Sequence, residues 1–591
     1  MSKRKGRKPK DRKAEAPADP EPRIEAPFAP PRVSLLLWIA GLAVVFGVFL
    51  VLKMFSVNPV AGDEHIYLYQ AKLVSEGVAP YSGFAMAHPP LQTLFAALLI
   101  KLFGYHFLLA RLLPVLFCLA GGVALAALVR RELGALASVA ATAVYVLSYE
   151  PLRSASHFTG VNMTVALVLG AVLAYRTGRI RTAAALCAAA VLTRLYAVPG
   201  VLTLAAFALL ADRRAGLRLT AYGLAIGAAA FVAVGLWAGF GDMVHNVLLY
   251  QVRKTPMAEA TLENMKMTVL FHNAPFAALF VLALPAVLAR ASGAWAHQSS
   301  VTRPSFLARL ASVLREPGAG LLVLASLMAI LFLAVLLRMN RVWMYYFIPP
   351  FPFAAIPAGY LVSRWILVVP RLVRARGRIA DAGLTRMELA GGMVLFILLA
   401  AAFALAPRLE RSLRYFDDES EKSAHAYTFR PGLLPDFMNS LVRATVWSDE
   451  RVIGDRYSGF TYLLWHESRV LDVADDMARE IASRTKDGDA IFGDSGTVPL
   501  LALMTGRRIA GNEVDTNIQR YRSGNADPEE MVRRIDTPST RLILVRPRFG
   551  VAGLPQLQEL LKARYTLVRT FRTAEDQVFL LYERRPEGAA P

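Results

Sequence analysis

The sequence predicts a polytopic α-helical membrane protein that carries a small α/β domain at its C-terminal end. Hydrophobic residues make up 55% of the 591 residues, an average above that of ordinary soluble domains. Apolar runs recur from residue 33 to residue 406, and the longest contain the ~20 residues that cross a bilayer. From residue 407 onward the chain is polar, and short predicted strands alternate with helices.

The first region, residues 1–32, is basic and then rich in Pro, Ala and Glu, which is typical of a disordered segment. The first apolar run lies too far into the chain and is too long for a cleavable signal peptide, so it is predicted to act as an anchor. Residues 33–406 form the predicted transmembrane domain, with a first extracytoplasmic loop at 56–106. Its eleven predicted spans are 33–55, 107–129, 135–148, 161–175, 182–196, 197–211, 217–239, 274–291, 318–337, 342–362 and 389–406.

Basic residues predict the orientation of these spans. The N-terminal segment holds eight Lys and Arg residues between positions 3 and 13, so it is predicted to stay in the cytoplasm. Eleven spans then place the arginine-rich loops after residues 129, 175, 211 and 362 on the same side. Counting the apolar stretch Pro89–Gly104 as a span would invert every later loop, so it is interpreted as an interfacial helix.

The polar region 407–591 is therefore predicted to lie outside the cytoplasm. Abundant Ala, Leu and Arg favour a bacterial protein, with this region in the periplasm and the spans in the inner membrane. Its predicted helices are 472–486, 497–504 and 555–563, and its predicted strands are 490–493, 541–545, 566–571 and 577–582.

Several functions are disfavoured by composition and motifs. The net charge of +21 follows the predicted cytoplasmic loops, so anionic lipid headgroups explain it better than nucleic acid does. Only two cysteines are present, Cys118 and Cys187, both within predicted helices, so no disulfide framework is expected. The sequence has no G-x-S-x-G elbow, Walker loop or C-x-x-C pair, which argues against a hydrolase, an ATP-driven pump and a zinc site.

The first loop gathers residues that can carry chemistry. Asp63 and Glu64 follow the first span directly, and Tyr67, Tyr81 and His88 lie in the same loop. An Asp after a Gly is commonly a helix cap, which remains a compatible reading of Asp63. Carboxylates near a low-dielectric interface have raised pKa values and are useful general bases, so the loop is also a candidate active site.

These residues carry a family resemblance. Asp63-Glu64, Gly77…Pro80-Tyr81 and His88-Pro89-Pro90-Leu91 resemble the first loop of the GT-C glycosyltransferases, most closely the protein O-mannosyltransferases and the lipid A aminoarabinose transferase. Arg111-Leu112-Leu113-Pro114, Leu192-Thr193-Arg194 and Asn340-Arg341…Tyr345-Tyr346 extend the resemblance over about residues 33–406.

The resemblance implies an inverting transfer of a sugar from a polyprenyl-phosphate donor to a lipid, glycan or protein acceptor. Asp63 is then the candidate base and Glu64 a supporting carboxylate, both assigned as catalytic. Cations must stabilise the departing phosphate, and an isolated Arg at membrane depth is usually functional or snorkelling, which favours Arg194. Arg341 is the second candidate, with an interfacial anchor as its alternative role.

The other predicted substrate-binding residues are Tyr67, Tyr81, His88, Glu150, Asn162 and Tyr345. Asn162 stands where relatives carry an Asp, and an amide positions an acceptor but takes no proton. Ala87 stands where some relatives carry an acidic metal ligand. No metal residue is therefore predicted, and a divalent cation stays open without support from the sequence.

Two non-enzymatic functions remain as alternatives. A lipid-linked glycan flippase would place ionisable residues at mid-membrane on facing helices and show repeat symmetry. This chain instead gathers its polar groups in predicted extracytoplasmic loops. A membrane-anchored scaffold would work through residues 407–591 and leave the Asp63 loop idle.

Overall fold

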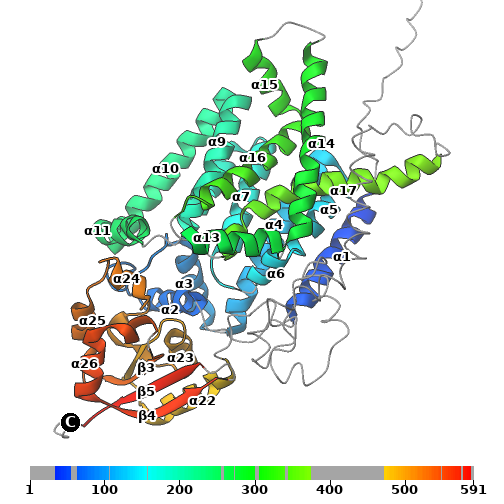
Figure 1. The fold of residues 1–591 in the computed structure, drawn as a ribbon. Helices are drawn as coiled ribbons and strands as arrows, with labels where there is room; N and C mark the ends of the chain where they lie inside the picture. Colours follow the sequence, from blue (N-terminus) through cyan, green and yellow to red (C-terminus); the bar gives the residue numbers. More distant parts are fainter. Residues whose placement is uncertain are drawn as a thin grey trace, which may run out of the picture.

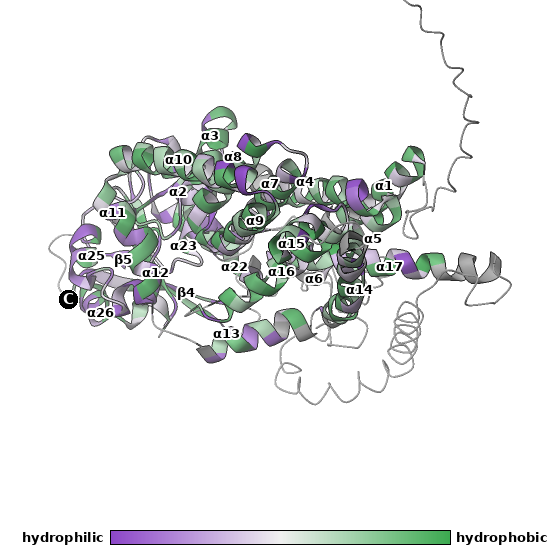
Figure 2. Ribbon diagram, turned by 90° about the horizontal axis from the view of Figure 1, so that it is seen from above, coloured by the Kyte–Doolittle hydropathy of each residue, from purple (hydrophilic) through white to green (hydrophobic). Residues whose placement is uncertain are grey.

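The computed structural model describes residues 34–54, 63–105, 107–155, 157–254, 258–271, 273–299, 305–339, 342, 344–374, 471–547, 549–573 and 577–586. These residues form a helical part and a smaller α/β domain, which lies against one end of the helical part (Figure 1). Figure 2 shows hydrophobic colouring over α9 (Val198–Ala211), α10 (Arg213–Ala238) and α16 (Ala319–Leu336) and hydrophilic residues on α25 (Pro528–Ile535) of the smaller domain. Both predicted parts are therefore present in the fold.

The helical part begins with α1 (Leu35–Met54), α2 (Asp63–Ser75), α3 (Leu91–Phe103), α4 (Phe107–Leu133), α5 (Ala135–Val146), α6 (Tyr149–Ser154), α7 (Val161–Arg176), α8 (Ile180–Thr193), η1 (Leu195–Ala197) and α9 (Val198–Ala211). It continues with α10 (Arg213–Ala238), α11 (Phe240–Val244), η2 (His245–Leu249), α12 (Tyr250–Arg253), α13 (Ala258–Met265), η3 (Lys266–Phe271), α14 (Ala274–Ser299), α15 (Phe306–Arg315), α16 (Ala319–Leu336), η4 (Met344–Phe347) and α17 (Pro350–Arg374).

Four described helices are long and apolar enough to cross a membrane: Leu112–Leu133, Arg213–Ala238, Phe276–Ala296 and Ala319–Leu336. Most of α10 is uncovered by protein, and its exposed side chains include Leu217, Leu224 and Leu236. Six further apolar helices have 10–17 residues. Every predicted span within the described residues overlaps a helix, whereas the predicted span 389–406 lies outside them. The predicted total of eleven spans stays a prediction.

Two predictions from the sequence differ from the structure. The predicted span 342–362 begins late, as helix α17 at Pro350, because proline fits the first helical turn and η4 occupies the preceding residues. No helix is predicted between the spans 217–239 and 274–291, but the described residues there form α11, η2, α12, α13 and η3. Two of these short helices are π-helical, a form that hydrophobic periodicity does not identify.

The smaller domain contains α22 (Leu471–Arg484), β1 (Ala490–Gly493), α23 (Val498–Thr505), β2 (Arg508–Ile509), η6 (Ala510–Asn512), α24 (Ile518–Arg522), α25 (Pro528–Ile535), β3 (Thr540–Val545), η7 (Gly550–Gly553), α26 (Pro555–Arg564), β4 (Tyr565–Arg572) and β5 (Val578–Arg584). The strand order is β2-β1-β3-β5-β4. Strand β1 is parallel to β2 and β3, whereas β5 is antiparallel to β3 and β4. All four residues of β1 are buried, as expected for a strand with parallel neighbours on both sides.

The two parts share one hydrophobic core. Ile66, Tyr69 and Leu73 of α2 pack in the same cluster as Leu501 of α23 and Leu542 of β3. The opposite side of α2 belongs to a second cluster with α3. Although its sequence is only weakly apolar, α2 is therefore buried on nearly all sides, and it lies between the helical part and the α/β domain (Figure 1).

Candidate active site

A polar cavity of about 170 Å³ lies where the helical part meets the α/β domain. Five of the predicted site residues line it: Asp63, Tyr67, His88, Arg194 and Tyr345. The remaining lining residues are Ile66, Gln70, Ala87, Leu195, Tyr196, Tyr250, Gln251, Lys254, Met339, Tyr346, Asp515 and Asn517. The cavity thus brings together residues that are far apart in the sequence.

Asp63 is the first residue of α2, where a carboxylate is stabilised by the positive end of the helix dipole. Its side chain is exposed to the cavity, and the Tyr345 hydroxyl donates a hydrogen bond to Oδ2 at 3.1 Å. A carboxylate held in this way can accept a proton from a hydroxyl group placed in the cavity.

Glu64 points away from this cavity. Its side chain is only 3% exposed, and Oε2 accepts a hydrogen bond from the backbone N–H of Phe158 at 3.3 Å. Its Oε1 lies 3.3 Å from Nε2 of the buried His65. The two adjacent acids therefore have different surroundings: Asp63 faces the cavity, and Glu64 holds the segment that precedes α7.

Arg194 caps the C-terminal end of α8 and is 2% exposed. Its guanidinium donates to the Thr159 carbonyl, with Nε at 2.8 Å, and to Gln92 Oε1, with Nη2 at 2.7 Å. Its Cζ lies 4.6 Å from the centre of the Tyr67 ring. Among the described residues no carboxylate forms an ion pair with Arg194, so its neighbours orient the charge without neutralising it.

Gly160 makes this arrangement of Arg194 possible. Its φ of +78° is left-handed, which glycine adopts at little cost. A Cβ at this position would lie 2.3 Å from Gln92 Oε1 and 2.8 Å from Arg194 Nε. Any side chain at residue 160 would therefore displace the guanidinium or the amide that orients it.

His88 and the two loop tyrosines form a connected group. The Tyr67 hydroxyl lies 3.1 Å from His88 Nε2, and the Tyr81 hydroxyl donates to the His88 carbonyl at 2.9 Å. Desolvation, reinforced by the positive charges of Arg194 and Lys254, lowers the pKa of His88 well below its ordinary value. The imidazole is therefore neutral at neutral pH and can accept a hydrogen bond from Tyr67.

Of the three other predicted residues, Asn162 alone has a described side chain. Asn162 is buried, and its Nδ2 donates to the Ser154 carbonyl at 2.8 Å, so it ties the end of α6 to the start of α7. Glu150 is the second residue of α6, and its side chain is outside the described part of the structure. Arg341 lies outside the described residues altogether.

Several residues that line the cavity or contact its lining were absent from the predicted site. Gln92 orients Arg194 and also donates to the Phe158 carbonyl at 2.9 Å. Tyr346 packs edge-on against Tyr196, with ring centres 5.3 Å apart. Lys254 lies above the Tyr250 ring at 4.6 Å. The motif that contains Tyr345 could have indicated Tyr346, whereas Asp515 and Asn517 reach the cavity only through tertiary folding.

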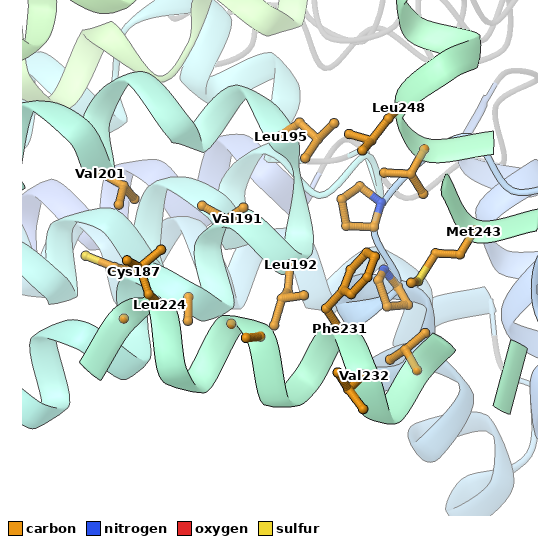
Figure 3. A pocket seen from close by; sticks show the side chains of 18 of the residues that line it. Cys187, Val191, Leu192, Leu195, Val201, Leu224, Phe231, Val232, Met243 and Leu248 are labelled. Carbon is orange, nitrogen blue, oxygen red and sulfur yellow. The ribbon is translucent and has the colours of Figure 1, made fainter. Parts of the chain in front are cut away.

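A larger apolar groove of about 540 Å³ adjoins the polar cavity. Its walls come from α8, η1, α9, α10, α11 and η2, together with Tyr81, Pro89 and Pro90 from the segment before α3. Figure 3 shows Leu192 on α8 facing Phe231 on α10 across this groove. Leu195 lines both the groove and the polar cavity, so the two spaces meet beside Arg194.

The described residues contain no group of three or more His, Cys, Asp or Glu side chains placed to hold a metal ion.

Comparison with known proteins places the fold. No protein-family model and no curated protein matches the sequence. The structure is similar to that of ArnT from Cupriavidus metallidurans bound to undecaprenyl phosphate, with a TM-score of 0.53, 17% identity, and coverage of 94% of this chain and 100% of that chain. For ArnT in the apo state the TM-score is 0.55, the identity 17%, and the coverage 93% and 97%. An oligosaccharyltransferase from Archaeoglobus fulgidus gives a TM-score of 0.46 at 11% identity, covering 90% of this chain and 74% of that chain.

The chain therefore shares the fold of ArnT over nearly its whole length. The resemblance predicted from the sequence is therefore confirmed at the level of the fold. The apolar helices and these membrane-protein neighbours indicate a membrane location.

Proposed function

We propose that this protein is an inverting glycosyltransferase that moves a sugar from a polyprenyl-phosphate donor to an acceptor hydroxyl on a lipid, a glycan or a protein. One observation carries the proposal: an oriented guanidinium, which has no carboxylate partner among the described residues, lies where an apolar groove meets a polar cavity that contains Asp63. A polyprenyl phosphate combines an apolar chain with an anionic headgroup, which matches this junction. ArnT, which has the same fold, binds undecaprenyl phosphate.

The donor is proposed to bind with its isoprenoid chain in the groove and its phosphate beside Arg194. Guanidinium matches phosphate oxygens in a bidentate manner, and Lys254 lines the same cavity. The charge of Arg194 is sequestered from water, so its interaction with an anion is stronger than that of an exposed arginine. Since the hydrogen bonds to Thr159 and Gln92 hold the guanidinium in place, little reorganisation accompanies binding.

The transfer step follows from these positions. The acceptor oxygen attacks the anomeric carbon on the face opposite the phosphate and forms the new glycosidic bond with inversion. The bond from that carbon to the phosphate oxygen breaks, and its electron pair leaves with the phosphate, where Arg194 stabilises the added charge. Asp63 takes the proton of the acceptor hydroxyl, and Tyr345 holds the carboxylate towards the cavity. No step in this scheme is assigned to a metal.

The other predicted binding residues have lesser roles in this proposal. Tyr67 supports Arg194 through its ring, and His88 contacts the phosphate end of the cavity in its neutral form. Glu64 and Asn162 shape the segment between α6 and α7, and Tyr81 contributes to the wall of the groove. Glu150 and Arg341 are retained as proposed acceptor and phosphate contacts.

We also propose that the reaction occurs on the periplasmic side of a bacterial inner membrane, with the N-terminus in the cytoplasm. The residues at the two ends of α8 support this orientation. Arg179 and Arg181 lie at its N-terminal end, beside Arg218 of α10, whereas Arg194 follows its C-terminal end. At 1.5 Å per residue these ends are about 20 Å apart, so the arginine-rich end and the candidate site lie towards opposite membrane faces.

The proposal is tested with purified protein in nanodiscs, radiolabelled polyprenyl-phosphate sugars and a membrane extract as acceptor. Wild type is expected to transfer label. Asp63→Asn is expected to bind the donor but to transfer label at a rate at least about 100-fold lower than wild type, because the amide cannot take the proton. Glu76→Gln, an exposed acid just after α2, is the matched control and is expected to retain full transfer.

Two results would contradict this function. Transfer by Asp63→Asn at the wild-type rate would exclude Asp63 as the base. A wild-type protein that binds polyprenyl phosphate and transfers no sugar from any donor, but moves the lipid across vesicle membranes, would instead identify a flippase.

A further inference from the structure

We propose that the α/β domain recognises the sugar that is transferred, with the Asp515 carboxylate binding sugar hydroxyl groups and Asn517 beside it. The inference rests on the proposed function, because it concerns the sugar of the same donor. It assigns to this domain a part in choosing the substrate as well as a structural role.

Asp515 and Asn517 line the polar cavity together with Asp63 and Arg194. Neither residue lines the apolar groove, which is walled by the helical part and the segment before α3. When the isoprenoid chain occupies the groove and the phosphate lies beside Arg194, the sugar attached to that phosphate extends into the polar cavity. The α/β domain therefore contributes side chains to the space that the sugar fills.

The segment that carries Asp515 is fixed against the first loop. The backbone N–H of Ile509 donates to the Tyr69 hydroxyl at 2.8 Å, and Asn512 Nδ2 donates to the Gly83 carbonyl at 3.3 Å. Gly511 and Asn512 have positive φ angles of 60° and 54°, which turn the chain sharply after β2. These contacts hold the segment against the first loop before any ligand binds.

Further contacts hold the segment from within the α/β domain. Thr516 Oγ1 donates to the Gly493 carbonyl at 2.7 Å. The buried Arg520 donates to the Asp515 carbonyl and lies 3.5 Å from Glu513 Oε2. Because Arg520 bonds the backbone of Asp515 and pairs with Glu513, it fixes the position of Asp515 without a hydrogen bond to its carboxylate.

The Asp515 carboxylate has capacity for a ligand. Its Oδ1 accepts the backbone N–H of Asn517 at 3.1 Å, and no described residue donates to Oδ2. A carboxylate offers about four acceptor positions, and hydroxyl groups are well-matched donors. A phosphate would be repelled by this charge and drawn to Arg194 and Lys254, which line the same cavity. The cavity therefore suits a ligand that is anionic at one end and carries hydroxyl donors at the other.

The test compares two lipids: polyprenyl phosphate without a sugar, and the polyprenyl-phosphate sugar that wild type uses. Asp515→Asn retains the Oδ1 acceptor for the Asn517 N–H but removes the charge, so the local turn is preserved. We expect its affinity for the sugar-bearing lipid to fall roughly 10- to 100-fold, and its affinity for the sugar-free lipid to match wild type. Asp475→Asn, an exposed acid on α22, is the matched control and is expected to change neither affinity.

The outcomes separate this inference from the proposed function. An equal loss of affinity for both lipids in Asp515→Asn would show a structural effect and overturn the inference. An unchanged affinity for the sugar-bearing lipid would overturn it as well. A wild-type protein that does not bind the sugar-free lipid would contradict the proposed function itself, and the inference with it. Thermal unfolding of Asp515→Asn at the wild-type midpoint confirms that the comparison is made between folded proteins.

Discussion

Two neighbouring acids and one arginine show how much a side chain's role depends on its surroundings. Asp63 and Glu64 are adjacent in sequence, but only Asp63 faces the polar cavity, because successive side chains of a helix point in different directions. Arg194 is buried as deeply as Glu64, and the two are not paired with each other. An oriented, buried cation without a described carboxylate partner has an uncompensated desolvation cost, which a bound anion offsets.

Replacement of Arg194 tests this role. We expect Arg194→Ala to lower the affinity for sugar-free polyprenyl phosphate by roughly 10- to 100-fold, the value of a hydrogen-bonded charge. Arg194→Lys keeps the charge but not the planar fork, so its loss is expected to be smaller. Equilibrium binding in nanodiscs measures both. The control is Arg218→Ala, which changes an arginine of α10 that lies beside the N-terminal end of α8, away from Arg194. An affinity unchanged in Arg194→Ala would remove Arg194 from the phosphate site.

A second residue-scale prediction concerns pH. The lowered pKa of His88 means that the folded protein favours the neutral ring. Its contribution to stability is therefore complete above the unfolded pKa of ~6.5 and is lost as the pH falls through the lower folded pKa. The difference in thermal midpoint between wild type and His88→Gln is expected to be constant from neutral pH upward and to shrink in acid. A difference that grows in acid would indicate a charged His88.

At the scale of elements, α2 is the piece that joins the site to both parts of the protein. One side carries Asp63, Tyr67 and Gln70 into the polar cavity, and the adjoining side carries Tyr69 and Leu73 into the core shared with the α/β domain. A shift of that domain is therefore a shift of the helix that presents Asp63. Geometry at the site and stability of the junction are coupled through this helix.

Tyr69→Phe tests the junction. The change removes the acceptor of the Ile509 N–H and leaves a buried donor unsatisfied, which costs about 1–3 kcal/mol. We expect a lower thermal midpoint together with faster proteolysis of the α/β domain. Tyr222→Phe, an exposed tyrosine on α10, is expected to behave as wild type. Equal stability of the two variants would mean that this hydrogen bond does not hold the domain.

The elements of the fold and the residues of the site differ in how far the sequence predicts them. The apolar runs predicted α4, α10 and α16 because burial against protein or lipid requires the same residue types. Asp63 was predicted from its loop and its resemblance to a family. Asp515 could not be predicted, because nothing local distinguishes it from a solvated turn acid, and its place in the same cavity as Asp63 depends on the docking of two distant segments. The helices of residues 240–271 were missed because they are short and partly π-helical.

For the whole molecule, the proposed orientation makes a direct prediction. Only two cysteines are present and both are buried, so a cysteine-free background requires two substitutions. In that background Asp487→Cys, exposed on the α/β domain, is expected to react with a membrane-impermeant maleimide from the periplasmic side. Arg213→Cys, exposed at the first residue of α10, is expected to react only after the membrane is opened. The reverse labelling pattern would show that the topology is opposite to the proposed one and would exclude a periplasmic reaction.

The hydrogen bond between Tyr69 and Ile509 joins residues that are 440 positions apart in the chain. A ribosome makes α2 early and the sheet that covers it last, after every helix of the membrane part has been synthesised. During most of translation the first loop therefore lacks the sheet of the α/β domain, and the apolar side chains that this sheet later buries are exposed. The proposed catalytic centre is therefore completed only at the end of biogenesis, and we expect a nascent chain arrested before residue 509 to be inserted in the membrane but inactive.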